Sequence, residues 1–146
     1  MNTKAILPMT ASDLRDVARL SEQLGYPTSA EALAPRLAHI LKRIDHKVFV
    51  YHLEKKVVGW IHLEVVLDLI EEAKLEIKAL VVDENYRGLK IGAELIEAAK
   101  EWARTQKLNT LYLSCNQKRV EAHRFYLKQG FQQQKASYFF ELNLSP

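Results

Sequence analysis

The sequence predicts an α+β fold, a mixed α/β arrangement in which a central mixed sheet of about six to seven strands is flanked by about four helices. In the first half of the chain, alternating apolar segments follow one another closely, as they do in hairpins, whereas strand and helix patterns alternate in the second half. The helical crossover at residues 89–106 should make the strands on either side of it parallel. We therefore expect a largely antiparallel sheet with one parallel pair.

The N-terminal third predicts one short strand and two helices. Residues 4–7 form the strand, and Thr10 with Asp13 then has the spacing of a capping box. Residues 28–31 supply a second capping box, and Pro35 lies inside the helix that follows, where a proline can interrupt it. Apolar residues recur at helical spacing in both helices: Leu14, Val17, Leu20 and Leu24, then Leu33, Leu37, Ile40, Leu41 and Ile44.

The rest of the chain predicts five more strands and two more helices. The strands are expected at residues 48–53, 57–67, 75–82, 110–114 and 138–144, and the helices at 89–106 and 120–129. A length of 146 residues fits one domain, 1–146, with a genuine core.

The composition excludes several classes of protein. Hydrophobic residues make up 48% and charged residues 27%, as in an ordinary soluble domain. No apolar run approaches the roughly 20 residues that a membrane helix needs, and the N-terminus is too mixed for a signal peptide. The single cysteine, Cys115, excludes an internal disulfide and is typical of a reducing cytoplasm, where we expect the protein to be. A net charge of +3 is too small to indicate nucleic-acid binding.

The charge is unevenly distributed along the chain. Residues 64–76 hold five acidic side chains and one basic one, a net charge of −4, so the remainder carries +7. A basic cofactor turn beside an acidic segment suits an anionic cofactor and a cationic acceptor. The alternative, a solvated acidic loop, stays open.

Residues 82–94 carry the strongest chemical signal. They follow an apolar strand and join it, through a basic turn that contains glycine, to the start of a long helix. Free N–H groups at a helix start, with the positive end of the helix dipole, are suited to bind a pyrophosphate. Arg87 adds a positive charge, and Gly88 and Gly92 allow backbone and ligand to approach closely. This turn therefore predicts a phosphorylated cofactor.

The turn resembles motif A of the GNAT N-acetyltransferase superfamily, in which Arg or Gln precedes two spaced small residues. Lys90 stands where that family usually has its first glycine, so its Cβ would push the pyrophosphate outward unless its ammonium pairs with it. A second segment resembles motif B: Asn116 follows a strand, and residues 119–131 contain Ala122, Phe125-Tyr126 and Gly130-Phe131. The resemblance covers roughly residues 48–142.

This resemblance implies a GNAT-like fold and an N-acetyltransferase that uses acetyl-CoA as its co-substrate. In that family the two parallel strands splay, and the pantetheine arm binds backbone groups in the gap. The positions that match the family's cofactor contacts are Leu80, Val81, Val82, Arg87, Gly88, Leu89, Lys90, Ile91, Gly92, Ala93 and Asn116. As a plain turn residue, Asn116 would also be unremarkable. Since no histidines and acids show the spacing of metal ligands, we expect no metal.

Tyr126 matches the helix tyrosine that often acts as the general acid in the family. A phenol has an ordinary pKa of about 10, which suits proton donation to a thiolate at neutral pH. The alternative is an amphipathic tyrosine packed on the sheet.

Glu76 is the candidate general base. If the hairpin is centred near Ile70, Glu64 lies across from Glu76, and two such carboxylates would make one easier to protonate. His62 shares that face and is a weaker alternative, whereas a surface pair of acids is the non-catalytic interpretation. We expect three further residues on the face of Glu76: Lys78, Leu80 and Val82.

The acceptor is expected to be a primary amine. The acidic segment favours a cationic small molecule, such as a polyamine or an aminoglycoside, although a protein or peptide amine stays open. A non-catalytic CoA-binding sensor is the main alternative, which Lys90 favours and Tyr126 opposes. Neither nucleic acid nor membrane is expected as a partner, whereas a homodimer joined through residues 138–140 is possible.

Overall fold

The computed structural model describes residues 3–146. The chain forms two compact units, one ending at Ser114 and one running from Cys115 to the C-terminus, and each is described by itself. That both belong to one acetyltransferase domain stays a prediction. In the described part of the chain, no helix has the length and apolar character needed to cross a bilayer.

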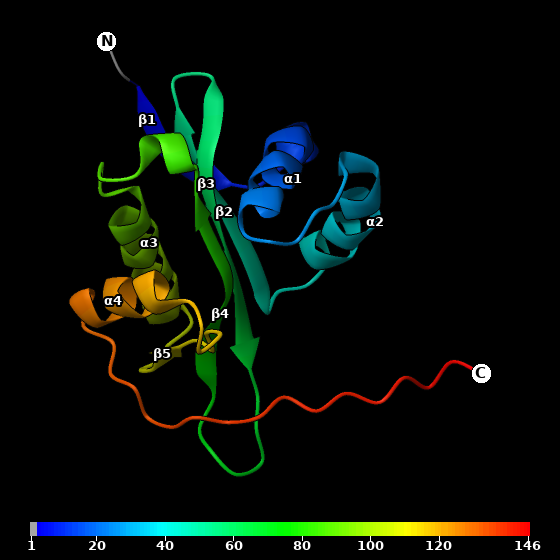
Figure 1. Ribbon diagram of the computed structural model, residues 1–146, viewed down its shortest axis with the longest axis vertical. Coiled ribbons are helices and arrows are strands. Elements are labelled where there is room, and N and C mark those ends of the chain that lie inside the picture. Colours follow the sequence, from blue (N-terminus) through cyan, green and yellow to red (C-terminus); the bar gives the residue numbers. More distant parts are fainter. Residues whose placement is uncertain (1–2) are drawn as a thin grey trace. The chain divides into compact units, whose positions relative to one another are not determined.

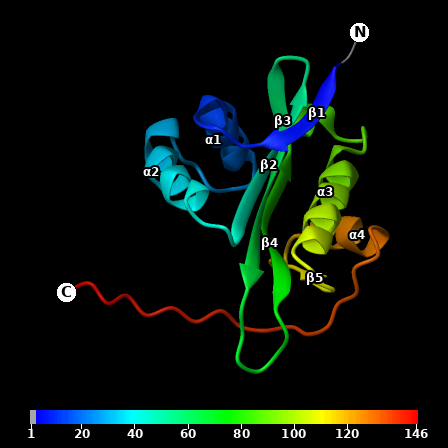
Figure 2. The same cartoon turned by 180° about the vertical axis from the view of Figure 1, so that it is seen from behind.

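The first unit contains five strands and three α-helices. In chain order they are β1 (Lys4–Pro8), a 3₁₀ turn (Ala11–Asp13), α1 (Leu14–Gln23), α2 (Ala30–Leu41), β2 (His46–Leu53), β3 (Lys56–Val66), β4 (Lys74–Val82), a 3₁₀ turn (Glu84–Tyr86), α3 (Ile91–Thr105) and β5 (Leu111–Tyr112). The sheet order is β1-β2-β3-β4-β5. Strands β1 to β4 pair antiparallel and β4 pairs parallel with β5, so the predicted mixed sheet is confirmed. Figures 1 and 2 show α1 and α2 on one face of this sheet and α3 on the other.

The strand count is lower than expected, because residues 138–144 form no strand. Alternating apolar side chains favour an extended chain, but a strand also needs a partner. This segment has none within the described chain, and its large apolar side chains are 81–89% exposed: Tyr138, Phe139, Phe140, Leu142 and Leu144. The homodimer that was expected to use it stays a prediction.

The two N-terminal helices begin at the predicted cap or one residue from it, since the second cap is Ser29 and not Thr28. Thr10 donates its backbone N–H to Asp13 Oδ2 over 2.9 Å, which forms the first capping box. Ser29 caps α2 by accepting the N–H of Ala32 at 3.1 Å. Helix α2 continues through Pro35 without interruption. These ends are local events, so the sequence suffices to place them.

The core lies on both faces of the sheet. On the face covered by α1 and α2, Trp60, Val50 and Leu20 are buried together. On the other face, a Cβ added to Gly59 would lie 3.1 Å from Ile91 Cγ2 and 3.2 Å from Leu95 Cδ1. The absence of a side chain at Gly59 therefore lets the first turns of α3 approach the sheet closely.

The pairing of β3 with β4 contains a bulge. Leu63 pairs with Ile77, but the next residue, His62, pairs with Ala79, so Lys78 is an extra residue in β4. Because β3 alternates regularly, Glu76 shares its face with Ala79 and Val81 and not, as expected, with Leu80 and Val82. The expectation was wrong because a bulge inverts the alternation beyond it.

Candidate active site

The turn between β4 and α3 presents unused backbone donors. Lys90 is the N-cap residue of α3 and makes no side-chain cap, and the N–H groups from Gly88 to Ala93 donate no hydrogen bond within the described part of the chain. The turn is exposed through Lys90, and Gly88 has a positive φ of 83°. An exposed and uncapped helix start with basic neighbours fits the diphosphate of coenzyme A.

Lys90 itself has left-handed backbone geometry, with φ 66° and ψ 18°. Only glycine adopts this region without steric cost, which gives a physical reason for glycine at this motif position. Lys90 therefore carries backbone strain, and its ammonium adds charge to the same turn.

A buried aspartate that sequence reasoning missed anchors this turn. Asp83 is fully buried, accepts the N–H of Asn85 at 3.1 Å and lies 3.0 Å from Arg19 Nη1. The side-chain oxygen Oε1 of Gln23 accepts the backbone N–H of Glu84 at 2.9 Å. Burial alone would raise the pKa of Asp83, but the hydrogen bonds from Asn85 and Arg19 hold it below the ordinary value. The only sequence signal was an acid directly after an apolar strand.

The edge of β4 that faces β5 is mostly unpaired. The parallel ladder consists of Leu75 with Leu111 and Glu76 with Tyr112, and the described chain shows no further pairing along that edge. Backbone groups between Ile77 and Val82 on this side are therefore available to another partner. They fit the amide groups of a pantetheine arm, which can pair with a strand edge.

The predicted carboxylate pair is confirmed. Glu64 of β3 and Glu76 of β4 are direct cross-strand partners. Between them, the Nζ of Lys78 lies 3.1 Å from Glu64 Oε1 and 3.5 Å from Glu76 Oε1. Burial would lower the pKa of Lys78, but the hydrogen bond to Glu64 and the charge of Glu76 raise it above the ordinary value. The sequence predicts Lys78 on the face of Glu76, and the contact of its Nζ with both carboxylates agrees with that expectation.

Two histidines extend this polar cluster across the same face. His46 Nδ1 lies 2.9 Å from His62 Nε2, and His46 Nε2 lies 3.3 Å from Glu64 Oε2. Burial, followed by the nearby His46, lowers the pKa of His62 to about 4. His62 is therefore neutral at pH 7, and its value as a general base is small because its conjugate acid is strong.

Asp45, His46 and Glu64 each bring one potential ligand atom within 4.8 Å of the others. Sequence spacing did not reveal this group because pairing of β2 with β3 assembles it. Both carboxylates already have cationic partners: Arg43 lies 2.8 Å from Asp45, and Lys78 contacts Glu64. The expected absence of a metal stays a prediction.

The second unit contains α4 (Val120–Lys128) and the motif B residues. Tyr126 packs edge-to-face against Phe125 and Phe131, with ring centroids 5.2 and 5.5 Å apart. Burial, with a smaller effect of Cys115, raises the pKa of Tyr126 to about 12, so the phenol keeps its proton at neutral pH. Asn116 Oδ1 accepts the N–H of Lys118 at 2.9 Å, which makes Asn116 a turn residue whose contact with a cofactor stays a prediction.

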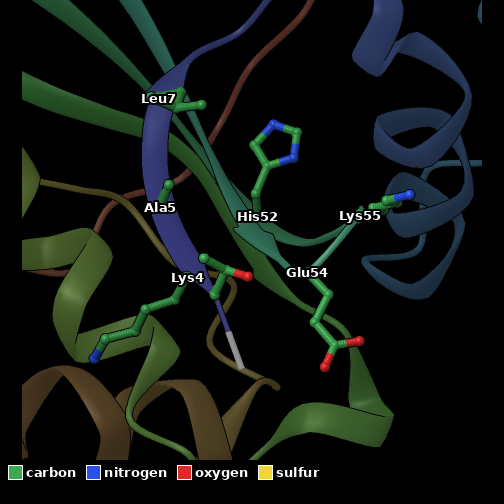
Figure 3. Close-up of a pocket in the computed structure, with 7 residues that line it drawn as sticks. Lys4, Ala5, Leu7, His52, Glu54 and Lys55 are labelled. Atoms are coloured by element: carbon green, nitrogen blue, oxygen red, sulfur yellow. The ribbon is translucent and has the colours of Figure 1, made fainter. Parts of the chain in front are cut away.

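A shallow pocket lies at the opposite edge of the sheet from β4 and β5. Its lining comes from β1, the end of β2 and the turn that follows (Figure 3): Thr3, Lys4, Ala5, Leu7, His52, Glu54 and Lys55. None of these residues belongs to the predicted site. The first strand is tied down nearby, since Lys4 Nζ lies 2.8 Å from Glu94 Oε1.

Comparisons with known proteins agree with this geometry. The model of the acetyltransferase (GNAT) family matches residues 12–131. A curated relative, the aminoalkylphosphonate N-acetyltransferase of Salmonella typhimurium (strain LT2), is 48% identical over 58 residues, which are 40% of this chain and 38% of that protein. The matched part of the chain thus spans well under half the length of that relative.

Solved structures are similar over nearly the whole chain. Aminoglycoside N-acetyltransferase AAC(6')-Iy, solved in complex with CoA, superposes with a TM-score of 0.88 at 14% identity and covers 97% of this chain and 96% of that one. Aminoglycoside 6'-N-acetyltransferase AAC(6')-Ih from Acinetobacter baumannii gives a TM-score of 0.86 at 14% identity, with 98% and 100% covered. At such identities the likeness concerns the fold alone.

Proposed function

The chain belongs to the GNAT acetyltransferase family and is an acetyl-CoA-dependent N-acetyltransferase, and we propose that it acetylates a small primary amine by direct attack. Acetyl-CoA, when bound, supplies an activated acyl group as a thioester. The single observation that carries this proposal is the uncapped start of α3, where six consecutive backbone N–H groups from Gly88 to Ala93 have no partner in the described chain. Arg87 and Lys90 add positive charge beside these donors.

Glu76 is proposed to accept the proton of the acceptor ammonium, directly or through one water. Its side chain is 23% exposed, and it is the last residue of β4 that pairs with β5 before the unpaired edge begins. As the nitrogen bonds to the acyl carbon and the carbon–sulfur bond breaks, Tyr126 is proposed to give its proton to the sulfur. The raised pKa of this phenol, about 12, favours its protonated form over the whole physiological range.

The acceptor is proposed to be a small molecule. Two chemical classes come from the relatives: aminoglycosides, which are polycations, and aminoalkylphosphonates, which carry one ammonium and an anionic group. Polyamines are further candidates, because they are polycations like the aminoglycosides. An amine of a protein or peptide is the remaining candidate. The acidic segment around Glu64 and Glu76 supports an acceptor with a positive charge in each case.

The alternative of a non-catalytic CoA-binding sensor rests on Lys90, because the strain at this residue would limit how closely the cofactor approaches. The two functions differ in turnover. A sensor would bind acetyl-CoA without releasing free thiol when an amine is present.

The deciding experiment is a thiol-release assay with acetyl-CoA and a panel of amines, run together with calorimetric titration of CoA.

The Tyr126→Phe variant should lower kcat roughly 100-fold while it keeps CoA affinity, if Tyr126 is the acid. Tyr138→Phe, at an exposed tyrosine, is the matched control. Glu76→Gln should flatten the rising limb of the pH–rate profile, and Glu72→Gln should leave it unchanged. Undiminished turnover in Tyr126→Phe would remove Tyr126 from this role.

The cofactor turn has its own test. Gly92 lies buried in the first turn of α3, so Gly92→Trp should block the diphosphate and weaken CoA binding. Native affinity in that variant, with the protein folded by circular dichroism, would place the cofactor elsewhere.

A further inference from the structure

Polar side chains form a row across four neighbouring strands of the sheet. His46 of β2 pairs with Glu64 of β3, and Glu64 pairs with Glu76 of β4. Glu76 in turn pairs with Tyr112 of β5. Directly paired residues project from the same face of a sheet, so these four side chains lie next to one another. Tyr112 ends the row on the side of β5.

Tyr112 lies where β4 and β5 stop pairing. Its pair with Glu76 is the last in the parallel ladder, and the edge of β4 from Ile77 to Val82 is unpaired beyond it. These six residues span roughly 20 Å. A pantetheine arm that begins at the diphosphate turn, after Val82, and follows this edge brings its thioester end toward Glu76 and Tyr112.

The two carboxylates of the row have different surroundings. On Glu64, Lys78 Nζ lies 3.1 Å from Oε1 and His46 Nε2 lies 3.3 Å from Oε2. On Glu76, Lys78 Nζ lies 3.5 Å from Oε1, and Oε2 has no partner among residues 3–146. Both oxygens of Glu64 are therefore occupied, whereas Glu76 keeps a free oxygen for an acceptor nitrogen.

The hydroxyl of Tyr112 is a second free group beside Glu76. Burial, followed by the charge of Glu76, raises the pKa of Tyr112, as expected for a phenol close to that carboxylate. The ring already has a partner, since Lys74 Nζ lies 5.8 Å from its centroid. The hydroxyl itself makes no hydrogen bond within the described chain.

We propose that Tyr112 is a further residue of the acceptor site, whose phenolic oxygen accepts an N–H of the acceptor nitrogen while Glu76 takes the proton of the ammonium. A phenol suits this position because its oxygen accepts hydrogen bonds and its O–H remains free to donate. The bond holds the nitrogen next to the thioester before the reaction begins. This role rests on the proposed function, because it adds a residue to that same site.

The test is Tyr112→Phe, which removes the hydroxyl and keeps the ring that Lys74 contacts. Thiol release is measured with acetyl-CoA and three probe acceptors: spermidine, kanamycin A and 2-aminoethylphosphonate. For every probe that the wild type acetylates, kcat/KM should fall roughly 10-fold, as for one lost hydrogen bond. The fall should come mainly from KM, because the ammonium already forms this bond before the reaction. Calorimetric affinity for CoA should not change.

The control is Tyr26→Phe, at a tyrosine of the same unit that is 71% exposed, and it should match the wild type with every probe. A double-mutant cycle with Glu76→Gln separates a role in the site from a structural one. If Tyr112 and Glu76 act on the same nitrogen, Tyr112→Phe should cost less in the Glu76→Gln background than in the wild type. Additive losses, together with a lower urea midpoint for Tyr112→Phe, would show a structural role and overturn the proposal.

The two proposals fail in different ways. Unchanged kcat/KM in Tyr112→Phe would remove Tyr112 from the acceptor site and leave the acetyltransferase intact. A fall in kcat of about 100-fold at an unchanged KM for the amine would also overturn this role, because it marks the acid that protonates the sulfur. An absence of thiol release from the wild type with all three probes would overturn the proposed function and the role of Tyr112 together.

Discussion

Arg19 Nη1 lies 3.0 Å from Oδ2 of Asp83, and this ion pair joins helix α1 to the turn that leads into α3. Asp83 has no exposed surface, whereas the Arg19 side chain is 37% exposed and also donates to the carbonyl of Val57 at 3.1 Å. One buried carboxylate thus connects α1, β3 and the predicted cofactor turn. The position of that turn depends on this contact as much as on its own glycine.

Asp83→Asn should destabilise the fold by about 2 kcal/mol, because it replaces a charge-assisted hydrogen bond to a buried carboxylate with a neutral one. Partial exposure of Arg19 keeps the loss below that of a fully buried pair. Urea unfolding at pH 7 measures the change. Asp45→Asn is the control, because its partner Arg43 is 60% exposed, and it should lower the stability much less than Asp83→Asn does. Equal losses in the two variants would contradict the role given to Asp83.

The acid stability of the same variant tests the charge itself. The pKa of Asp83 is lower in the folded chain than in the unfolded one, so the unfolded state takes up its proton first as the pH falls. The stability from this carboxylate is therefore fully present above the ordinary value near 4 and is lost as the pH drops through the folded value. Asp83→Asn should show a shallower loss of stability below pH 4 than the wild type, measured by thermal melts.

Local signals explain why much of the fold could be predicted. The capping box at Thr10 and the N-cap at Ser29, one residue after the start of the predicted second box, depend on residues three positions apart, so the helix starts are visible in the sequence. The facing of Glu64 and Glu76 follows from hairpin symmetry alone. The basic turn before α3 is also contiguous, and the left-handed geometry of Lys90 accounts for the glycine usual there.

Features that depend on distant partners could not be predicted. The bulge at Lys78 arises in the pairing of β3 with β4 and moves Leu80 and Val82 to the face opposite Glu76, which periodicity within one strand cannot reveal. The burial of Asp83 requires Arg19, which is 64 residues away. The terminal segment at residues 138–144 has strand-like alternation but no partner strand in the described chain.

Lys90→Gly should stabilise the fold by roughly 0.5–1 kcal/mol, because it relieves left-handed strain and the greater freedom of the unfolded glycine offsets part of the gain. It should also weaken CoA binding, since the ammonium beside the diphosphate is lost. Lys107→Gly is the matched control: Lys107 has φ 59° but follows the far end of α3. It should give a similar gain in melting temperature with unchanged CoA affinity. Tighter CoA binding in Lys90→Gly would show that the side chain obstructs the cofactor.

Gly59→Ala should destabilise the fold by about 1–3 kcal/mol, the usual cost of overpacking a core. The new Cβ would lie 3.1 Å from Ile91 Cγ2 and 3.2 Å from the carbonyl oxygen of Val81, and a backbone atom cannot move aside cheaply. A double-mutant cycle with Ile91→Ala, which removes the contacted methyl group, should show that the two losses are not additive. Simple additivity would mean that α3 does not press on Gly59.

His62→Gln should make the fold more resistant to acid between pH 6.5 and pH 4. The pKa of His62 is about 4 in the folded chain against an ordinary 6.5. Over this interval the His62 side chain is therefore protonated in the unfolded state and neutral in the folded state. The wild type should therefore lose stability as the pH falls from 6.5, by roughly 3 kcal/mol in all, and the loss should level off below pH 4.

Glutamine cannot titrate but can still donate to His46 Nδ1, so it should remove this slope with little change at pH 7. Urea midpoints measured at half-unit pH steps give the comparison, with the exposed His39→Gln as the control. Parallel curves for the wild type and His62→Gln would show that other groups cause the acid sensitivity.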